Sequence, residues 1–446
     1  MKKITLGGVR TTLTPPRFYS PQPPQKSRNH QRRKAATVTE ASPSVLHPPF
    51  PTMNDSTLTF IKQHRNDDIR QLALTKPASD IDLKLALQQI AGWQTARRKL
   101  PDWAACDNIL YPPHLNMEQA SSQQTAQYKA NVVERWGGKD TSYVDLTGGM
   151  GIDFSFMARA FDKRTYVERN EMLCQLAHHN FPILQLEAAV TNDDAEDFVN
   201  KMARATVIFI DPARRDEHGA RTYGLADCTP DVTLMMPVLR EKAEHIVMKL
   251  SPMLDWRKAV DDLGGASEVH IVSVKNECKE LLLVIDHRAS ANPTLICIND
   301  EQRFCPSDTT ETPTCQPTAT DNSALDNTYL YEPNASIMKG GCFTEVGRAF
   351  AMQQVAANSH LFLSNTAVES FPGRSFIVKQ QCSLNKRELR QALAGIDRAN
   401  VAVRNFPLSA EVLRKKLKLK DGGDTYIFGT TLPDGNHALF VCRKIG

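Results

Sequence analysis

The residues best suited to chemistry stand where short apolar segments end, in the middle of the chain. Residues 144–153 read VDLTGGMGID, an apolar strand pattern followed by a glycine-rich turn that opens a helix. Glycine at 149 and 151 would let the backbone approach a cofactor where a Cβ would collide with it. Asp145 and Thr147 complete this predicted cofactor-binding turn. Alone, the turn is weak evidence, because many glycine-rich turns bind nothing.

Acidic residues at the next two strand ends strengthen the prediction of an adenosine site. Glu168 ends the second apolar segment, where a carboxylate can accept hydrogen bonds from both ribose hydroxyls. Asp194 follows the third segment and is expected to accept from the adenine amino group. Asp193 competes for that role, and a helix N-cap is the alternative reading of Asp194.

The fourth apolar segment ends in the loop FIDPARRDEHG, which is the predicted catalytic position. Asp211 is expected beside a transferable methyl group, and Pro212 holds the backbone rigid there. Arg214 is expected to act with them, and Arg215 to bind substrate, by clamping phosphate or stacking on a base. A solvated pair of arginines is the alternative.

The order of these strand-end residues favours S-adenosylmethionine as the cofactor. NAD is the main alternative cofactor for the same kind of fold. The NAD-binding motif GxGxxG requires a third glycine, and this chain has Phe154 at that position. Asp194 and the loop at Asp211 also favour S-adenosylmethionine. No Cys/His spacing suggests a metal site.

Apolar segments that alternate with helical patterns position these residues. Five predicted strands lie at 142–147, 164–168, 187–192, 206–211 and 245–250, followed by a hairpin of 269–274 with 280–286. This alternation predicts an α/β, Rossmann-like sheet of seven strands. Residues 53–131 are helical in pattern, and 117–136 read as one helix.

The composition predicts five segments in the 446-residue chain. They are a disordered basic tail at 1–52, a helical domain at 53–131, the cofactor-binding domain at 132–286, a less regular region at 287–372 with a mobile loop at 305–327, and a small α+β domain at 373–446. Translation starting at Met53 is an alternative to a functional tail.

Charge is distributed unevenly along the chain. The net charge is +4, with +8 in residues 1–52, +7 in residues 375–446 and therefore −11 between them. A basic C-terminal region suggests a polyanionic partner, with a solubilising surface as the alternative. Its predicted helix carries four candidate phosphate contacts, namely Arg414, Lys415, Lys416 and Lys418.

The remaining composition favours a cytoplasmic enzyme. The ten cysteines show no CxxC pair, which fits reduced thiols. No secretory signal pattern opens the chain, and no apolar run reaches the length of a membrane span. The oligomeric state does not follow from the sequence.

The chain resembles a family of class I methyltransferases from Bacteroidetes that carry a ferredoxin-like insert and a C-terminal THUMP-like domain. The resemblance covers residues 53–446 and rests on the motifs DLTGGMGID, DPARR, KLSPMLD, KNECKELL, YLYEPNASIMKGG and FPGRSF. It implies a ferredoxin-like domain at 287–372 and a THUMP-like one at 373–446. Because THUMP domains in other enzymes are associated with binding tRNA, it also implies an RNA substrate, either tRNA or rRNA.

The absence of a cysteine at the end of the fifth predicted strand narrows the choice of acceptor atom. Enzymes that methylate uracil at C5 need a cysteine there to attack C6, and this chain has Ser251. A nitrogen or a ribose oxygen therefore remains as the acceptor. Lys249 is expected either to face the same cleft or to extend into solvent. The alternatives are a methyltransferase of proteins or small molecules, and a non-catalytic RNA-binding protein with this fold.

Overall fold

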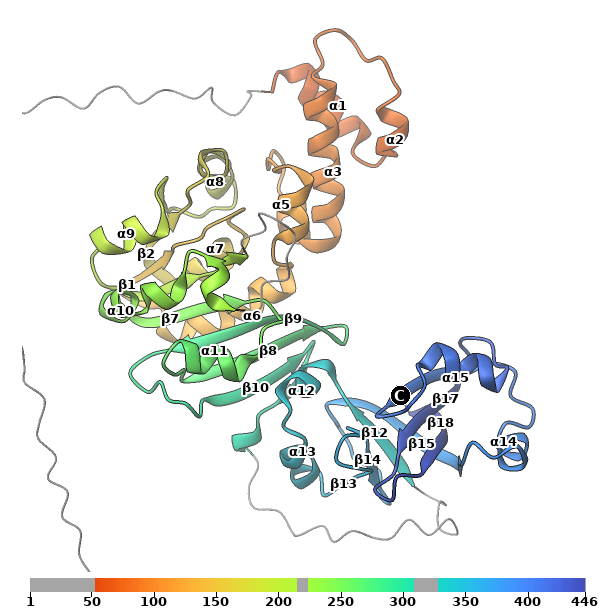
Figure 1. The fold of residues 1–446 in the computed structure, drawn as a ribbon. Coiled ribbons are helices and arrows are strands. Elements are labelled where there is room, and N and C mark those ends of the chain that lie inside the picture. Colours follow the sequence, from red (N-terminus) through yellow and green to blue (C-terminus); the bar gives the residue numbers. More distant parts are fainter. Residues whose placement is uncertain (1–52, 215–223, 309–327, 446) are drawn as a thin grey trace, which may run out of the picture. The chain divides into compact units, whose positions relative to one another are not determined.

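The structure is a computed structural model that describes residues 53–214, 224–308 and 328–445. The predicted tail at 1–52, most of the predicted loop at 305–327, and Arg215 lie outside the described residues. Within them, no helix combines the length and apolarity that crossing a bilayer requires. Figure 1 labels the elements in chain order.

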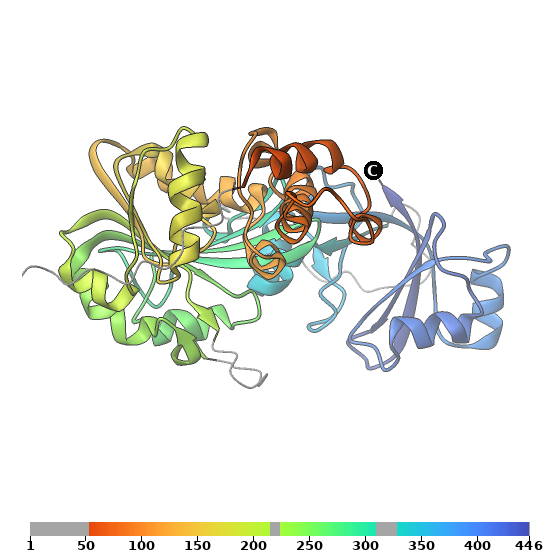
Figure 2. The ribbon, with the colours of Figure 1, turned by 90° about the horizontal axis from the view of Figure 1, so that it is seen from above.

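The region before the first strand is helical, as predicted, but its helices are shorter than expected. The predicted single helix at 117–136 is two, because Ser122 accepts a hydrogen bond from the Thr125 N–H and caps a new helix. The helices of this region are α1 (Asp55–His64), α2 (Ile69–Leu72), α3 (Leu83–Lys99), α4 (Pro101–Ala105), α5 (His114–Gln119) and α6 (Gln123–Val133), followed by the 3-10 turn η1 (Glu134–Trp136). The first of them lie together in red and orange in Figure 2, whereas α6 packs against the sheet.

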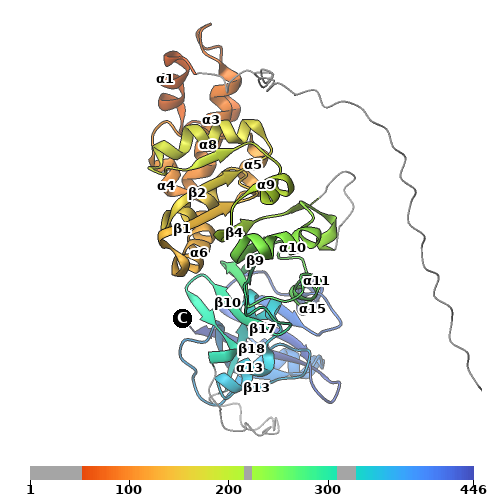
Figure 3. The same cartoon turned by 90° about the vertical axis from the view of Figure 1, so that its left-hand side faces the viewer.

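A sheet of nine strands forms the central layer, in the order β11-β10-β8-β9-β7-β4-β1-β2-β3. Figure 3 shows β2, β1 and β4 side by side. The first five strands in the chain order of this sheet pair in parallel, and β9 is antiparallel to both β7 and β8. The strands are β1 (Gly138–Asp145), β2 (Phe161–Val167), β3 (Ala189–Thr191), β4 (Ala205–Ile210), β7 (Ala243–Leu250), β8 (Glu268–Val274), β9 (Glu277–Ile285), β10 (Thr294–Asn299) and β11 (Gln302–Phe304).

The seven predicted strands are present, and two more extend the sheet. β10 pairs in parallel with β8, and β11 returns antiparallel beside β10. Both lie in the range 287–372 that the sequence analysis gave to the ferredoxin-like domain. The short strand pattern there carries no signal of which sheet it joins, because sheet pairing depends on long-range contacts.

Helices cover both faces of this sheet, and alternate strand residues point to opposite faces. Tyr143 and Phe209 belong to one core with α6, α7 and α8, whereas Val144 and Ile208 belong to the other with α9, α10 and α11. Each fully buried side chain of this size contributes about 1.5–3 kcal/mol. The remaining elements of this region are α7 (Ile152–Met157), η2 (Ala158–Ala160), α8 (Glu171–Ile183), α9 (Ala195–Lys201), β5 (Ala213–Arg214), η3 (Leu225–Asp227), β6 (Cys228–Thr229), α10 (Val232–Lys242), α11 (Trp256–Asp262) and η4 (Pro306–Asp308).

The C-terminal part forms a second sheet of seven strands, in the order β13-β14-β12-β15-β18-β17-β16. A hairpin with its turn at 433–435 joins β17 to β18. The elements are β12 (Tyr329–Pro333), α12 (Ala335–Gly340), α13 (Phe343–Ala349), β13 (Gln353–Gln354), β14 (Phe362–Ser364), β15 (Gly373–Cys382), α14 (Lys386–Ala392), β16 (Asn400–Arg404), α15 (Ala410–Leu417), β17 (Thr425–Thr431) and β18 (His437–Ile445).

Within this sheet, one buried carboxylate joins the two C-terminal segments, residues 287–372 and residues 373–446. β12 pairs antiparallel with β15, so residues from both segments share one ladder. Glu332 on β12 is 2% exposed, and its carboxylate is paired with Arg374 on β15 and with Arg404 on β16. Because a buried carboxylate is costly without such partners, this pairing favours the observed register.

Candidate active site

A cavity of about 760 Å³ opens at the carboxyl ends of β1, β2, β4 and β7. Parallel strands bring these ends to one edge of the sheet, which is where ligands bind in open α/β sheets. The residues predicted at the strand ends that line the cavity are Asp145, Thr147, Gly149, Glu168, Asp194, Asp211, Pro212, Lys249 and Ser251. The volume is in the range of small-molecule sites.

Three glycines shape the turn after β1, and each is needed for a different reason. Gly149 has a φ of +56°, and a Cβ there would meet no atom nearer than 3.7 Å, so its outer side is open to a ligand. Gly148 lies against a ring, because a Cβ would come within 2.1 Å of Tyr166. The Tyr166 hydroxyl donates to the Gly149 carbonyl oxygen at 2.6 Å. These contacts hold the turn in place.

Gly151 has a structural reason to be glycine that differs from the predicted one. It is the N-cap of α7 with a φ of +82°, and a Cβ there would lie 2.8 Å from Phe181. It is not among the residues that line the cavity. The sequence prediction gave it direct access to the cofactor, whereas the structure accounts for it by helix capping and packing.

Glu168 lies at the end of β2 with its carboxylate oriented by backbone. Oε2 accepts from the Gly149 N–H and Oε1 from the Asn170 N–H, both at 2.8 Å. A carboxylate has about four lone-pair positions, so acceptor capacity remains for two ribose hydroxyls. The arrangement ties the ends of β1 and β2 together and aims the carboxylate into the cavity.

The structure distinguishes the two aspartates after β3. Asp194 is the N-cap residue of α9 by position, but its side chain makes no capping hydrogen bond. Its exposed carboxylate lines the cavity instead. Asp193 also lines the cavity, but its carboxylate accepts from the Asp194 N–H at 3.0 Å and pairs with Lys201 at 3.3 Å. Asp194 is therefore the better placed of the two to accept from a ligand.

Asp145 and Thr147 connect the turn to the end of β4. Asp145 is 1% exposed and accepts from the Thr147 N–H at 2.9 Å. Burial raises the pKa of Asp145 well above its ordinary value. The Thr147 hydroxyl accepts from the Asp211 N–H at 2.7 Å. Thr147 thus fixes the backbone of the predicted catalytic loop.

Lys249 faces the cavity and does not extend into solvent. Its ammonium lies 2.5 Å from Asp211 Oδ2 and 3.7 Å from Asp153 Oδ2, and its side chain is 15% exposed. Burial alone would lower the pKa of Lys249, but the Asp211 and Asp153 carboxylates raise it well above its ordinary value. Lys249 is therefore a charged hydrogen-bond donor in the cavity wall.

A second lysine, which the sequence analysis did not identify, lies behind this pair. Lys129 of α6 is fully buried, 2.6 and 2.7 Å from the two Glu280 oxygens on β9 and 3.2 Å from Asp153 Oδ1. Five side chains thus form one chain of alternating charges, called the ion-pair network below: Asp211, Lys249, Asp153, Lys129 and Glu280. Lys129 and Glu280 are 151 residues apart, so no local spacing signals the pair.

The predicted arginines and C-terminal cations are only partly accounted for. Arg214 lies on β5, a two-residue strand within the predicted catalytic loop that pairs with β6. On α15, Arg414 is paired with Asp421 and Lys415 with Glu411, which leaves less of their charge available for phosphate. Lys416 and Lys418 are exposed and have no ion pair to a residue that the structure describes.

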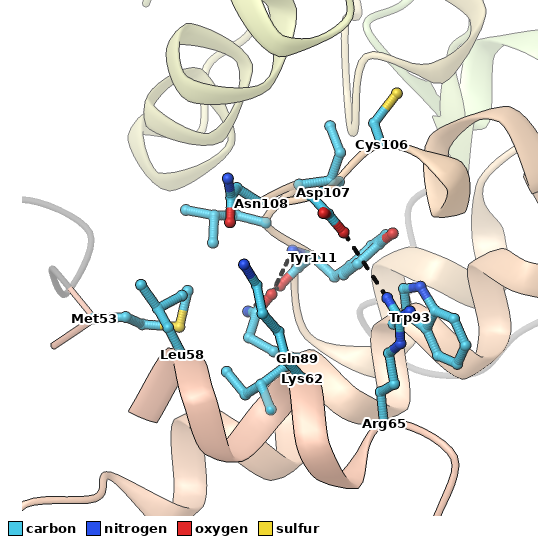
Figure 4. A pocket seen from close by; sticks show the side chains of 13 residues that line it. Met53, Leu58, Lys62, Arg65, Gln89, Trp93, Cys106, Asp107, Asn108 and Tyr111 are labelled. Carbon is cyan, nitrogen blue, oxygen red and sulfur yellow. Dashed lines mark hydrogen bonds and ion pairs between the residues drawn. The ribbon is translucent and has the colours of Figure 1, made fainter. Parts of the chain in front are cut away.

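A smaller cavity of about 60 Å³ lies among the N-terminal helices, as Figure 4 shows. Arg65 reaches Asp107 at 3.9 Å and lies over the Trp93 ring. The Gln89 amide exchanges two hydrogen bonds with the Tyr111 backbone. These polar groups are engaged within the protein, and the cavity holds about two water volumes.

Two family models match the C-terminal part of the chain. A THUMP domain-like model covers residues 373–444, and a ferredoxin-like domain model covers residues 329–372. The second model begins after β10 and β11, consistent with the place of those strands in the large sheet. No curated protein matches the chain.

The strand order and the site at the carboxyl edge define the fold of class I methyltransferases, as predicted. The crystal structure of a candidate methyltransferase from Porphyromonas gingivalis W83 is similar over 87% of this chain and 98% of that chain, with 29% identity and a TM-score of 0.75. The resemblance to Bacteroidetes methyltransferases with ferredoxin-like and THUMP-like domains is thereby confirmed.

More distant solved structures share part of the chain. A candidate class I S-adenosylmethionine-dependent methyltransferase from Listeria monocytogenes has 10% identity, covers 55% of this chain and 93% of that chain, and gives a TM-score of 0.34. A 16S rRNA methyltransferase from T. thermophilus, in complex with AdoMet and guanosine, has 13% identity, covers 37% and 43%, and gives 0.28.

Proposed function

We propose that this protein is an S-adenosylmethionine-dependent methyltransferase that modifies RNA, either tRNA or rRNA, at a nitrogen or a ribose oxygen. The observation that carries the proposal is the cavity of about 760 Å³ at the carboxyl edge of the sheet. Gly149 presents open backbone there, and Glu168 and Asp194 present carboxylates. These groups fit the ribose hydroxyls and the amino group of an adenosyl ligand.

The catalytic part of the proposal rests on the cavity residues at the ends of β4 and β7. Bound S-adenosylmethionine supplies a methyl group on a positively charged sulfur. Asp211 and Lys249 lie at the ends of β4 and β7, where they can orient an acceptor in line with that group. Thr147 and Pro212 hold the Asp211 backbone, so the acceptor meets a rigid wall.

An RNA substrate is supported by the C-terminal region. Residues 373–444 match a THUMP domain-like model, and residues 375–446 carry a net charge of +7. Lys416 and Lys418 are exposed on and after α15, as phosphate-contacting lysines must be.

Methyl transfer tests the catalytic proposal. The full-length protein is incubated with methyl-tritiated S-adenosylmethionine and with total RNA from a strain that lacks the gene, and RNA-bound label is measured. We expect label in RNA with the wild type and with the control Glu171→Ala, and a loss of at least tenfold with Glu168→Ala. Glu171 is an exposed carboxylate three residues away on α8. Label in protein or in small molecules instead would refute the RNA substrate.

Salt-dependent binding tests the role of the C-terminal lysines. In the full-length protein, Lys416→Gln with Lys418→Gln should lower the slope of log affinity for RNA against log salt by about two. The matched control is Lys76→Gln with Lys84→Gln, two exposed lysines of the N-terminal helical region. Equal slopes for both variants would contradict recruitment through α15.

A further inference from the structure

The cavity wall at the ends of β4 and β7 presents a hydrogen-bond donor beside an acceptor. The Lys249 ammonium and the Asp211 carboxylate are 2.5 Å apart, and both residues line the cavity. The Asp211 side chain is 36% exposed and that of Lys249 is 15% exposed, so a substrate atom can reach both. An acceptor group placed here meets N–H donors and carboxylate oxygens at adjacent positions.

The lone pairs of the acceptor atom decide which group suits this wall. An amine or ring nitrogen has one lone pair, which attack on the methyl carbon consumes, so none remains for an ammonium donor. A hydroxyl oxygen has two lone pairs and one proton. One pair can attack while the other accepts from Lys249, and the O–H can donate to Asp211.

From this complementarity we propose that the acceptor is the ribose 2′-hydroxyl of RNA, held between Lys249 and Asp211. The inference rests on the proposed function and specifies its acceptor. Within an RNA strand the other ribose oxygens are esterified or in the ring, so the 2′-hydroxyl is the free alcohol.

The rest of the lining agrees with a ribose acceptor. Among the described residues that line the cavity, the only aromatic is Phe209, and it is 1% exposed. The described part of the lining thus offers no exposed aromatic ring on which a base could stack, which is the common way to hold a base. A carboxylate acceptor would meet the Asp211 and Asp153 charges, which repel it.

The buried part of the ion-pair network keeps Lys249 in place. Asp153 lies 3.7 Å from the Lys249 ammonium and is 12% exposed. Lys129 lies 3.2 Å from Asp153 on its far side and is held by Glu280. The Lys129 and Lys249 charges together lower the pKa of Asp153, although burial opposes this. Asp153 therefore stays charged and positions the Lys249 donor at the wall.

The proposed step balances in atoms and charge. A lone pair of the 2′-oxygen forms a bond to the methyl carbon as the bond between that carbon and sulfur breaks, with its electron pair left on sulfur. The hydroxyl proton passes to the Asp211 carboxylate and then to water. Lys249 remains an ammonium and stabilises the negative charge that develops on the oxygen.

Alkaline hydrolysis of the labelled RNA tests the proposal with the wild-type protein alone. Alkali cleaves RNA only where a 2′-hydroxyl is free, so a 2′-O-methyl group leaves an alkali-resistant dinucleotide. We expect the tritium in dinucleotides. Tritium in mononucleotides shows base methylation and overturns the ribose acceptor while the RNA function stands. Absence of tritium from RNA overturns the RNA function itself, and this inference with it.

Variants test the assignment to Lys249 with a second readout. Lys249→Met should reduce transfer at least a hundredfold, while calorimetry shows an affinity for S-adenosylmethionine within about threefold of the wild type. Lys258→Met, at an exposed lysine of α11, is the control and should match the wild type in both. Transfer by Lys249→Met within about fivefold of the wild type would overturn its role. If that variant does not fold, Asp211→Asn carries the same test.

Discussion

Removal of the Lys129 charge should destabilise the protein strongly, because it leaves two carboxylates buried with too few partners. Lys129 is fully buried, while the side chains of Glu280 and Asp153 are 4% and 12% exposed. Breaking a buried ion pair from one side costs about 3–5 kcal/mol. We therefore expect Lys129→Met to lower the free energy of unfolding by about 3–5 kcal/mol at pH 7.

Removing both charges should recover most of that loss. In Lys129→Met with Glu280→Leu, the carboxylate left unpaired by the single change is gone, and we expect about 2–3 kcal/mol of stability to return. Because burial raises the pKa of Glu280, the loss in the single variant should also shrink as the pH falls and that carboxyl takes up a proton.

Urea unfolding followed by circular dichroism measures these differences. Lys84→Met, at an exposed lysine of α3, is the control and should stay within about 0.5 kcal/mol of the wild type. A loss below about 1 kcal/mol for Lys129→Met would refute the reasoning. So would a double variant that is less stable than the single one.

Two further predictions concern the glycine turn and an acid-sensitive ion pair. Gly148→Ala places a Cβ about 2.1 Å from the Tyr166 ring. It should lower the free energy of unfolding in urea by about 1–3 kcal/mol and weaken S-adenosylmethionine binding. Unchanged values for both would contradict the turn geometry. Burial would raise the pKa of Glu268, but hydrogen bonds from His270 and Arg135 lower it to about 2. Its folded-state pKa is thus below the ordinary value, so its stabilisation is present at neutral pH and is lost as pH falls toward 2. Glu268→Gln should be less stable than the wild type by about 1–3 kcal/mol at pH 7, because Arg135 is 41% exposed and solvent screens the pair. The difference should shrink as the pH falls from about 4 toward 2, and a difference that is constant with pH would be inconsistent with this.

The residues predicted to bind the adenosyl group could be placed in one cavity from the sequence, because they lie at strand ends. Gly149, Glu168, Asp194 and Asp211 each follow an apolar segment, and parallel pairing brings such ends to one edge without further information. Their shared cavity was therefore predictable. Their roles toward a bound ligand remain predictions.

The ion-pair network could not be found from the sequence in the same way. Lys129 lies on a helix before the first strand, and Glu280 lies on the antiparallel strand β9. Only the tertiary fold brings them together. From the sequence alone, a buried lysine on an amphipathic helix cannot be distinguished from a solvent-exposed one. The pairing of β10 with β8 was missed for a related reason, since it depends on contacts between distant residues. The helix start at Ser122 is different, because Ser122 and Thr125 are three residues apart and this N-cap is a local signal that the sequence contains.

Calorimetric titration with S-adenosylmethionine tests the central claim most directly, namely that the Gly149 turn and Glu168 form an adenosyl site. We predict binding by the wild type and by Glu171→Ala, and about a hundredfold weaker binding by Glu168→Ala, because two hydrogen bonds to a charged group are lost. No binding by the wild type, or equal affinity in Glu168→Ala, would contradict the account.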